Sequence, residues 1–352
     1  MMQFDRHNEN NGAIGWIAPS NIALIKYWGK KERQIPCNPS LSLTLNKSVS
    51  KTIVEYKKDS NPTLEFFFNR KKEPVFEKRV VNYYDSVKSS LSYSNEYSLK
   101  IKSENTFPHS AGIASSASFF SSLALCLLSL DHIVRQTKLL PDSFYREASG
   151  LARLGSGSAC RSVYGPYALW GKTKDKVSAN EYAVKLSTGY NPSFDGMKDA
   201  ILIVSSEKKS VSSSKGHSLM NQHPYAEKRF KSAKLNLDNI QDAMINNEQE
   251  KFIDIVENEA LTLHAMMLTS NPSYILMHPN TLHIINRIRN FRRRIGIFMC
   301  FTLDAGPNIH LLYHKRDFSV IKDFIISELS PYLENKRWID DEAGKGPELL
   351  NL

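Results

Sequence analysis

The first third of the chain alternates apolar and polar positions, which is typical of strands that bury one face. Four segments show this pattern, and they are separated by a polar loop and short turns: residues 14–18, 22–28, 40–45 and 52–56. The sequence therefore predicts a β-rich start to the fold.

Helical spacing, with apolar residues three and four apart, takes over at three later places. The segments are residues 114–130, which follow a Gly/Ser-rich turn, then 250–268 and 279–293. Further strands are predicted at 163–171, 182–186, 200–204 and 296–303. The second half is thus more helical, and we place the domain change at about Tyr190, which gives an α+β protein with domains at 1–190 and 191–352.

Residues 205–218 break this regular patterning. They contain seven serines interleaved with Lys208, Lys209 and Lys215. Such a composition after an apolar strand is typical of a mobile polar loop or of a plain flexible linker. The linker is the favoured interpretation of the sequence alone.

Composition agrees with a globular protein of about two domains. The chain has 352 residues, of which 41% are hydrophobic and 23% charged. These values exclude a small disulfide scaffold and global disorder. The 46 Lys and Arg outnumber the 36 Asp and Glu and give a net charge of +10, which favours anionic partners. The charge alone does not distinguish a phosphorylated metabolite from nucleic acid.

Cysteine spacing and the N-terminal residues bear on the compartment. The four cysteines contain no C-x-x-C pair, so neither a thiolate zinc site nor a disulfide framework is indicated. The N-terminal residues lack the apolar core of a signal peptide, and the longest apolar stretch, 119–130, is interrupted by serines and too short to span a bilayer. We expect a cytoplasmic protein outside the membrane.

The first candidate functional segment is residues 108–118, Pro-His-Ser-Ala-Gly-Ile-Ala-Ser-Ser-Ala-Ser. Their small side chains let backbone N–H groups approach an anion at a helix N-terminus, and Ser115 and Ser116 add hydroxyl donors. Phosphate is the natural ligand of such a loop. The alternative is a serine-capped helix that needs small residues for packing.

Residues 153–162 form a second small-residue turn. Two Gly-Ser pairs lie between Arg153 and Arg161, whose guanidinium groups could hold carboxylate or phosphate oxygens. Cys160 stands where a dinucleotide-binding fingerprint needs its third glycine, so that motif is excluded. A turn with surface arginines is the alternative.

Two further segments place charged residues at strand ends. Lys26, within residues 18–30, lies in an apolar run and should have a partner, unless it is an edge-strand lysine that opposes aggregation. Asp304 follows the strand predicted at 296–303 and could abstract a proton or hold a metal, unless it only begins a turn.

The arginines at 287, 289 and 292–294 form a basic helix end. They could touch nucleic acid, but a solvated helix C-terminus explains them more simply.

Together and in this order, these segments resemble the GHMP kinase superfamily, whose ATP loop has the pattern Pro-x-x-x-Gly-x-x-Ser-Ser. Residues 25–30 (Ile-Lys-Tyr-Trp-Gly-Lys), 155–162 (Gly-Ser-Gly-Ser-Ala-Cys-Arg-Ser) and 304–308 (Asp-Ala-Gly-Pro-Asn) are similar to the diphosphomevalonate decarboxylase family within it. So is the C-terminal Gly344-Lys-Gly-Pro. The resemblance implies a two-domain GHMP kinase fold, with an N-terminal domain like domain 2 of ribosomal protein S5, a C-terminal α/β domain, and the active cleft between them.

The resemblance also implies an activity, the ATP-dependent conversion of 5-diphosphomevalonate to isopentenyl diphosphate with release of CO2, ADP and phosphate. Asp304 would take or orient the proton of the 3-hydroxyl, and Lys26 would keep Asp304 ionised and steady the transferring phosphoryl group. Arg161 would bind substrate anions, including the carboxylate.

The remaining roles implied by the resemblance concern binding, with ATP and Mg2+ as cofactors and a homodimer as the assembly. The substrate diphosphate would be held by Tyr27, Lys30, Ser156 and Ser158, with Ser213 and Ser214 near the reacting phosphate. The ATP phosphates would be held by Pro108, Gly112, Ala114, Ser115 and Ser116. Metal ligands are not assigned.

Three positions depart from the family pattern. His109 and Ser110 stand where Thr-Ala is common, and Phe119 stands where glycine is usual and could alter the fit of adenine. Three alternatives stay open: a related enzyme acting on 5-phosphomevalonate or mevalonate, one that stops at 3-phosphorylation, or a non-catalytic homologue that binds phosphometabolites.

Overall fold

The structure is a computed structural model that describes residues 8–107, 115–137, 140–174, 178–186, 189–207 and 209–352. Its first sheet is built on two long antiparallel strands, β1 (Asn11–Ala23) and β2 (Ser40–Lys58). β4 (Tyr97–Asn105) continues the sheet beyond β2, and β3 (Leu64–Phe68) pairs with β4 in parallel through the crossover helix α1 (Pro74–Val87). Two short strands, β5 (Tyr167–Trp170) and β6 (Ala183–Lys185), extend the other end of β2.

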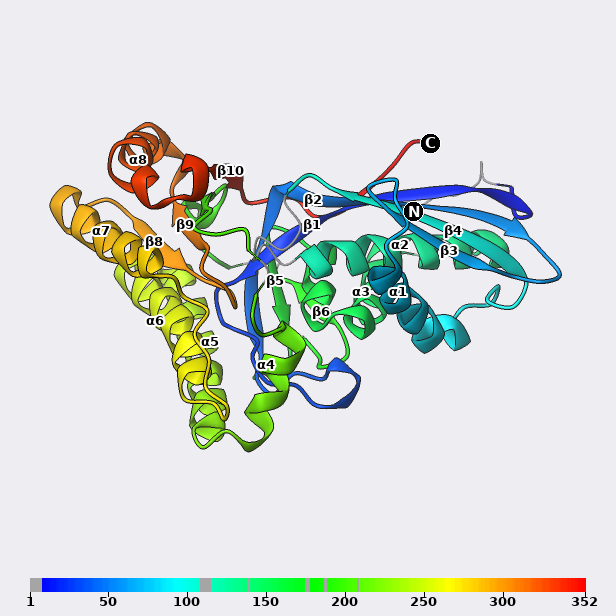
Figure 1. Cartoon of the computed structure of the whole chain (residues 1–352), viewed down its shortest axis with the longest axis horizontal. Coiled ribbons are helices and arrows are strands. Elements are labelled where there is room, and N and C mark those ends of the chain that lie inside the picture. Colours follow the sequence, from blue (N-terminus) through cyan, green and yellow to red (C-terminus); the bar gives the residue numbers. More distant parts are fainter. Residues whose placement is uncertain (1–7, 108–114, 138–139, 175–177, 187–188, 208) are drawn as a thin grey trace.

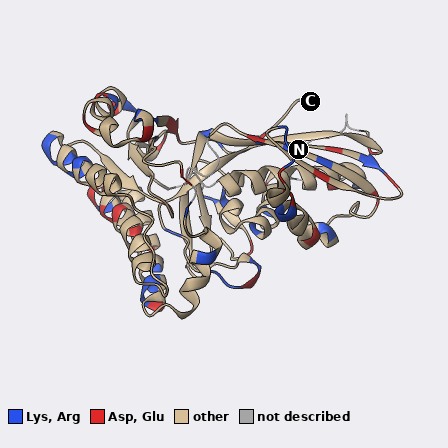
Figure 2. Cartoon of the chain, viewed as in Figure 1, with Lys and Arg blue, Asp and Glu red and all other residues tan. Residues whose placement is uncertain are grey.

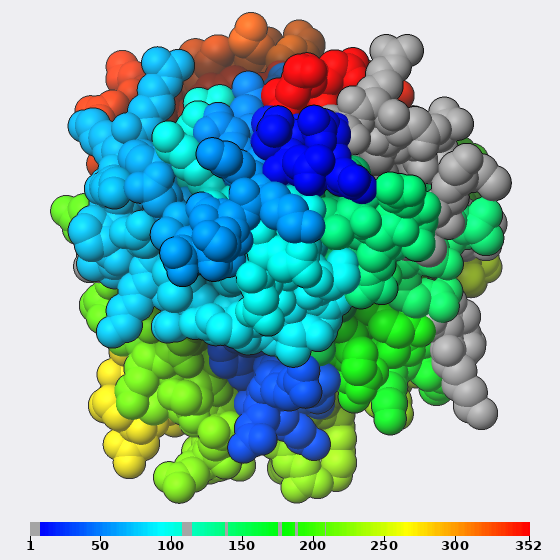
Figure 3. Space-filling model, turned by 90° about the vertical axis from the view of Figure 1, so that its right-hand side faces the viewer, coloured from blue at the N-terminus to red at the C-terminus, as the bar shows by residue number. Residues whose placement is uncertain are grey.

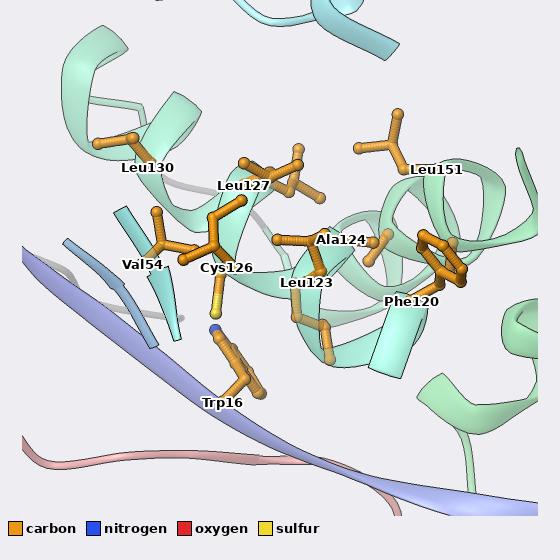
Figure 4. Packing of buried hydrophobic residues seen from close by; sticks show 14 of the residues in the cluster. Trp16, Val54, Phe120, Leu123, Ala124, Cys126, Leu127, Leu130 and Leu151 are labelled. Carbon is orange, nitrogen blue, oxygen red and sulfur yellow. The ribbon is translucent and has the colours of Figure 1, made fainter. Parts of the chain in front are cut away.

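Helix α2 (Ser115–Arg135) forms the core of this first domain and packs across β1 and β2, with α3 (Pro141–Gly155) beside it. Figure 4 shows Trp16 of β1 and Val54 of β2 directed at Cys126 and its neighbours on α2. The indole N–H of Trp16 donates to Ser129 Oγ at 2.9 Å, so the one polar atom of that ring is satisfied inside the core.

The second domain holds a four-stranded antiparallel sheet in the order β10, β7, β9, β8. The strands are β7 (Lys198–Leu202), β8 (Met299–Thr302), β9 (Ile309–Tyr313) and β10 (Trp338–Glu342). Three long helices run side by side against this sheet (Figure 1): α5 (Ala226–Asn246), α6 (Gln249–Leu268) and α7 (Pro279–Ile295). α8 (Phe318–Phe324) packs on α7 through stacked Phe291 and Phe324.

A large apolar cluster joins the two domains. Ile22, Leu24 and Ile25 from the end of β1 pack in one core with Phe252 and Val256 of α6. Burial of apolar surface on this scale fixes the two sheets relative to one another. The segment that follows β1 therefore lies between the domains.

The structure confirms the type of the predicted helices and strands more often than it confirms their boundaries. The helices expected at 250–268 and 279–293 are α6 and α7, and the one at 114–130 is α2. The two strands expected at 14–18 and 22–28 are one strand that ends at Ala23, so the strand prediction for residues 24–28 is wrong. The ladder stops there because Leu24 and Ile25 both donate to Leu41, and the next N–H, of Lys26, donates to a side chain instead.

Residues 205–218 are not a plain linker, because their last part is helical. α4 (Ser213–Leu219) begins there, with Ser212 as its N-cap accepting a hydrogen bond from the N–H of Lys215. Gly216 lies against Trp28, and a Cβ at Gly216 would come 2.5 Å from that indole. The linker interpretation is therefore wrong for this part, which packs on the segment after β1.

The apolar and basic features noted in the sequence have structural explanations. α2 is long and apolar enough to cross a membrane by composition, but 94% of that stretch is buried in the protein as the core helix. On α7, Arg289 and Arg292 pair with Glu257, and Arg294 pairs with Glu328. Figure 2 shows basic and acidic residues intermixed along α5 to α7, a distribution unlike a basic nucleic-acid face.

The chain returns to the first sheet at its end. β11 (Glu348–Leu349) pairs with β1, opposite Trp16 and Ile17, and Ala343 bridges to Leu45. Figure 3 shows the first described residues, in dark blue, adjacent to the last residues of the chain, in red, on one face. The domain boundary at residue 190 stays a prediction. The C-terminal segment lies after that boundary in sequence but pairs with the sheet of the first domain.

Candidate active site

A cleft of about 580 Å³ lies where the two domains meet. Its wall contains most of the residues singled out from the sequence: Lys26, Tyr27, Lys30, Ser115, Ser116, Ser156, Ser158, Arg161, Ser213, Ser214 and Asp304. All four chemical segments (18–30, 108–118, 153–162 and the turn at Asp304) and the serine segment 205–218 thus contribute residues to one place. The predicted phosphate-loop residues Pro108, Gly112 and Ala114 lie outside the described residues.

Asp304 and Lys26 form the centre of the cleft, and we call them the cleft pair. Asp304 follows β8 and Lys26 follows β1, and Lys26 Nζ lies 3.1 Å from Asp304 Oδ1. The Lys26 side chain is 1% exposed, whereas that of Asp304 is 29% exposed and opens to the cleft. The expectation that Lys26 has a partner is confirmed, and its second one is the carbonyl oxygen of Ala23 at 2.6 Å.

The charges around the cleft pair favour an ionised carboxylate. Burial alone would raise the pKa of Asp304, but the opposite charge of Lys26 and its hydrogen bond outweigh burial, so the pKa lies below its usual value. Burial lowers the pKa of Lys26, against the opposing charge of Asp304. The pair therefore presents a carboxylate oxygen ready to accept a proton and an ammonium group beside it.

The backbone on either side of Asp304 is fixed by α6. His264, which is 1% exposed, lies with Nε2 3.1 Å from the carbonyl oxygen of Asp304. Burial lowers the pKa of His264 to about 4, so the ring is neutral near pH 7 and donates this hydrogen bond through Nε2–H. The N–H of Gly306 reaches the same oxygen at 2.7 Å, which closes the turn after β8.

The main chain of Lys26 is held from behind by a buried group that we call the clamp: Glu259, Arg229 and Asn236. Glu259 accepts from the N–H of Lys26 at 2.8 Å and from Asn236 at 2.7 Å. Arg229 donates to both oxygens of Glu259, at 3.0 and 2.6 Å, and the pair is 1% and 0% exposed. Both oxygens of Glu259 are thus satisfied, and a bidentate pair of this kind is the geometry that buried charges require.

Arg161 lies in a short 3-10 helix (Gly157–Val163) after α3 and reaches the cleft from a buried position. Its side chain donates to Asn21 Oδ1 at 3.1 and 3.3 Å and to Ser40 Oγ at 3.1 Å. These partners are neutral, and burial lowers the pKa of Arg161. A buried arginine without a paired carboxylate can take an anionic ligand.

Arg153, the other arginine of that segment, has a different role. It donates to the backbone carbonyls of Glu181 and Arg33 and does not line the cleft. The sequence could not separate the two arginines, because both flank the same Gly-Ser turn.

Serine hydroxyls run across the floor of the cleft. Ser116, in the first turn of α2, lies 3.2 Å from Ser156, which lies 3.5 Å from Ser158, measured between Oγ atoms. Hydroxyl groups rotate to donate or accept, so this row can meet anionic oxygens without adding charge. It links the start of α2 to the turn after α3.

Tyr27 and Lys30 line the side of the cleft nearest α4. Tyr27 Oη is buried without a hydrogen-bond partner in the described structure, and burial raises the Tyr27 pKa well above its usual value, so it remains a phenol. Gly157 makes room for it, since a Cβ there would come 2.5 Å from Tyr27 Oη. Lys30 Nζ has one partner, Gln34 Oε1 at 2.8 Å, and burial lowers its pKa.

Sequence reasoning did not single out three further side chains on this wall: Lys209, Arg79 and His217. Lys209 appeared only as one lysine of a polar loop, yet its charge acts on Asp304. Arg79 belongs to α1, a helix that the sequence analysis did not predict. The only available signal for Lys209 was its place in the polar segment that follows a buried strand.

Phe119 and Asn308 prove to be structural. Phe119 is 1% exposed and packs between Phe66 and Phe76 at 5.6 and 4.8 Å, and of these rings only Phe76 reaches the cleft. Asn308 accepts from the N–H groups of Val204 and Ser205 and thereby ties the turn after β8 to β7.

The described residues contain no cluster of three or more His, Cys, Asp or Glu that could hold a metal ion. A Mg2+ ion typically binds through one or two carboxylates together with substrate phosphates and water. The donor set of this cleft, one carboxylate among hydroxyls and cations, suits a metal that arrives with a phosphorylated ligand.

Comparison with known proteins places the whole chain. Residues 18–183 match the family model of the diphosphomevalonate decarboxylase-like N-terminal domain, and residues 200–348 match that of the mevalonate 5-diphosphate decarboxylase C-terminal domain. The diphosphomevalonate decarboxylase of Debaryomyces hansenii is 30% identical over 329 residues, covering 89% of this chain and 82% of that protein.

Solved structures agree in fold over nearly the full length. The mevalonate diphosphate decarboxylase of Staphylococcus aureus superposes with a TM-score of 0.84 at 29% identity, covering 97% of this chain and 99% of the other. A structure of MDDEF in complex with MVAPP, AMPPCP and magnesium gives a TM-score of 0.81 at 28% identity, with the same coverage. The α+β two-domain GHMP kinase fold is thus confirmed, and the chain belongs to the diphosphomevalonate decarboxylase family.

Proposed function

We propose that this protein catalyses the ATP-dependent decarboxylation of 5-diphosphomevalonate to isopentenyl diphosphate, CO2, ADP and phosphate. The observation that carries the proposal is the cleft pair, an ionised Asp304 with Lys26 Nζ at 3.1 Å on the wall of a cleft rich in anion-binding groups. Membership of the diphosphomevalonate decarboxylase family supports the same reaction.

The reaction needs a base and a charge stabiliser at one point, and the cleft pair supplies both. Asp304 accepts the proton of the 3-hydroxyl as that oxygen bonds to the terminal phosphorus of ATP, whose bond to ADP breaks. The lowered pKa makes Asp304 a weak base, so the proton moves as the new P–O bond forms. Lys26 faces the negative charge of the transferring phosphoryl group.

Elimination follows because phosphate is a better leaving group than hydroxide. The C3–O bond breaks, the bond from C2 to the carboxylate carbon breaks, and its electron pair forms the C2–C3 double bond as CO2 leaves. Arg161 is assigned to the carboxylate, since its guanidinium is buried and held in place by Asn21 and Ser40. A fixed carboxylate keeps the breaking bonds aligned.

The diphosphate of the substrate is assigned to the part of the cleft wall that presents neutral and cationic donors. Tyr27 Oη, Lys30 Nζ and the hydroxyls of Ser156 and Ser158 are the donors there. Two of these donors are already observed as unpartnered or singly partnered groups, which a multiply anionic ligand satisfies. The net charge of +10 favours encounter with such a ligand.

ATP is assigned to the start of α2, with Ser115 and Ser116 on its phosphates and Ser213 and Ser214 across the cleft near the transferring group. Pro108, Gly112 and Ala114 keep their predicted role in the same loop. Mg2+ bound with the nucleotide would neutralise phosphate charge, and the hydroxyls of Ser115 and Ser116 would help to hold the phosphates to which it binds.

The test is an assay of purified protein with Mg-ATP and, separately, mevalonate, 5-phosphomevalonate and 5-diphosphomevalonate, following ADP and CO2 together. Equal ADP and CO2 from the diphosphate alone is the expected result. ADP without CO2 identifies a 3-kinase, and CO2 from the monophosphate identifies a related decarboxylase. Nucleotide and substrate binding without either product identifies a non-catalytic homologue.

We also propose that the protein is a homodimer, on the ground of the family resemblance alone, and that it is cytoplasmic, on the ground of its cysteine spacing. Light scattering after gel filtration tests the assembly, with twice the 40.0 kDa chain mass expected. A single-chain mass at working concentration contradicts it.

A further inference from the structure

His217 is the one histidine on the wall of the cleft, within the part of the chain that the structure describes, and the proposed reaction gives it no role. It belongs to α4 and is 7% exposed. Its ring packs against Tyr27 and Trp28, with centroids 4.4 and 4.5 Å away. These contacts hold the imidazole in one orientation beside residues assigned to the substrate diphosphate.

The hydrogen bond at Nδ1 settles which tautomer the ring adopts. The backbone N–H of Gly29 donates to His217 Nδ1 at 3.0 Å. Burial, together with the like charges of Lys30 and Arg161, lowers the pKa of His217 to about 3, so the ring is neutral at physiological pH. A neutral ring that accepts at Nδ1 carries its only proton on Nε2.

Nε2–H is therefore a donor, and the described residues offer it no hydrogen-bond partner. An unpartnered donor on a buried ring is costly unless a ligand or water accepts from it. The groups around it, Lys30 and Arg161, are already cationic. A neutral donor adds a hydrogen bond to an anion here without adding a third positive charge.

We propose that His217 is a substrate-binding residue whose Nε2–H donates to an oxygen of the substrate diphosphate, on the side of Tyr27 and Lys30. The inference rests on the proposed function, because it takes the diphosphate to be bound on this wall. It makes α4 part of the substrate site through an uncharged contact.

Two substitutions separate this role from a structural one. In His217→Asn the amide oxygen can take the place of Nδ1, two bonds from Cβ, and accept from Gly29, but nothing replaces Nε2–H. In His217→Gln the amide nitrogen can take the place of Nε2, three bonds from Cβ, but the acceptor for Gly29 is lost. His283→Asn, on the outer side of α7 where the ring stacks on Tyr332, is the matched control.

We expect H217N to raise the KM for 5-diphosphomevalonate about tenfold, the loss of roughly one hydrogen bond to an anion. The KM for ATP should stay within twofold, and H217Q should be affected less than H217N. The reverse order, with H217N close to wild type and H217Q impaired, overturns the proposal and leaves His217 as a support for Gly29. Equal effects on both variants, or no change in KM in either, also overturn it.

Nitrogen NMR of the imidazole provides a test that does not depend on variants folding. Adding 5-diphosphomevalonate without ATP to wild-type protein labelled at histidine should shift the Nε2 resonance while Nδ1 remains an acceptor. Binding seen by calorimetry without that shift overturns the inference. These measurements, together with the CO2 assay, distinguish failure of this inference from failure of the proposed function. Wild-type protein that binds the substrate with the Nε2 shift but releases no CO2 refutes the proposed function alone.

Discussion

Lys26 takes part in two buried ion-pair systems that differ in completeness. The clamp behind it satisfies both oxygens of Glu259 with four donors, and its charged members are 1% and 0% exposed. In the cleft pair, Asp304 Oδ1 meets a single ammonium group and 29% of the side chain is open. The carboxylate of Glu259 accepts hydrogen bonds only from protein groups, whereas the carboxylate of Asp304 can still accept a hydrogen bond from a ligand.

The difference shows how a reactive carboxylate is kept ready. The clamp fixes the backbone of Lys26 from α5 and α6, and His264 of α6 fixes the backbone of Asp304. Both partners are thus positioned by rigid helices through their main chains, which leaves their side chains to act on substrate. The clamp contributes mainly to stability and the cleft pair to catalysis. Substitutions in the clamp should therefore lower the free energy of unfolding, and substitutions in the cleft pair should lower activity.

Removing the charge of Asp304 should have the largest effect on activity. We expect Asp304→Asn to lower kcat about 10³-fold, since it removes a base from the reacting proton, while the Kd for ATP stays within threefold. Steady-state kinetics and nucleotide titration measure the two quantities. Activity within tenfold of wild type contradicts the assignment of Asp304 as the base.

Breaking the clamp should instead cost stability. Arg229→Met leaves Glu259 as a buried carboxylate without its cation, which costs about 3–5 kcal/mol of unfolding free energy. Denaturant unfolding measures it, with Lys231→Met, an exposed position on the same helix, as a control that should leave the melting temperature unchanged. A loss of activity at full stability refutes the distinction between the two pairs.

Lys26→Met should change the pH dependence of catalysis as well as its rate. Without the ammonium group the pKa of Asp304 rises, because the largest of the charges that oppose the effect of burial is lost. The acid limb of the kcat profile should therefore move to higher pH, with kcat at pH 7.5 lower by about 10². An unshifted acid limb means that Lys26 does not control the protonation of Asp304.

The buried histidines predict a smaller effect, on stability in acid. Burial lowers the pKa of His264 to about 4, below that of an unfolded chain, so the unfolded state binds the extra proton first as pH falls. Stability is complete above about pH 6.5 and declines toward pH 4, by at most about 1.4 kcal/mol per pH unit for this residue. Thermal melts of wild type and His264→Asn should differ in this slope, and equal slopes contradict the prediction.

The site was more predictable than the fold around it. Lys26, Arg161 and Asp304 stand out locally as charged residues in apolar or small-residue segments, and the family resemblance then assigned them to the site where the local pattern alone left a structural alternative. The clamp could not, because Arg229 and Glu259 look like ordinary surface charges of amphipathic helices until α5 and α6 pack on the end of β1. The segment 24–28 was mistaken for a strand for the same reason: its apolar residues face a domain interface that only the tertiary structure reveals.

The return of the chain to β1 has a mechanical consequence. The second domain is attached to the first sheet twice, by the connection that follows β6 and by the segment from Ala343 to β11. A domain attached at two points can rotate only about the axis through both, so opening the cleft widely requires both connections and the shared apolar cluster to move together. Access of ligands to the cleft should therefore depend on local movement of short elements such as α4, while the two sheets keep their relative orientation during turnover.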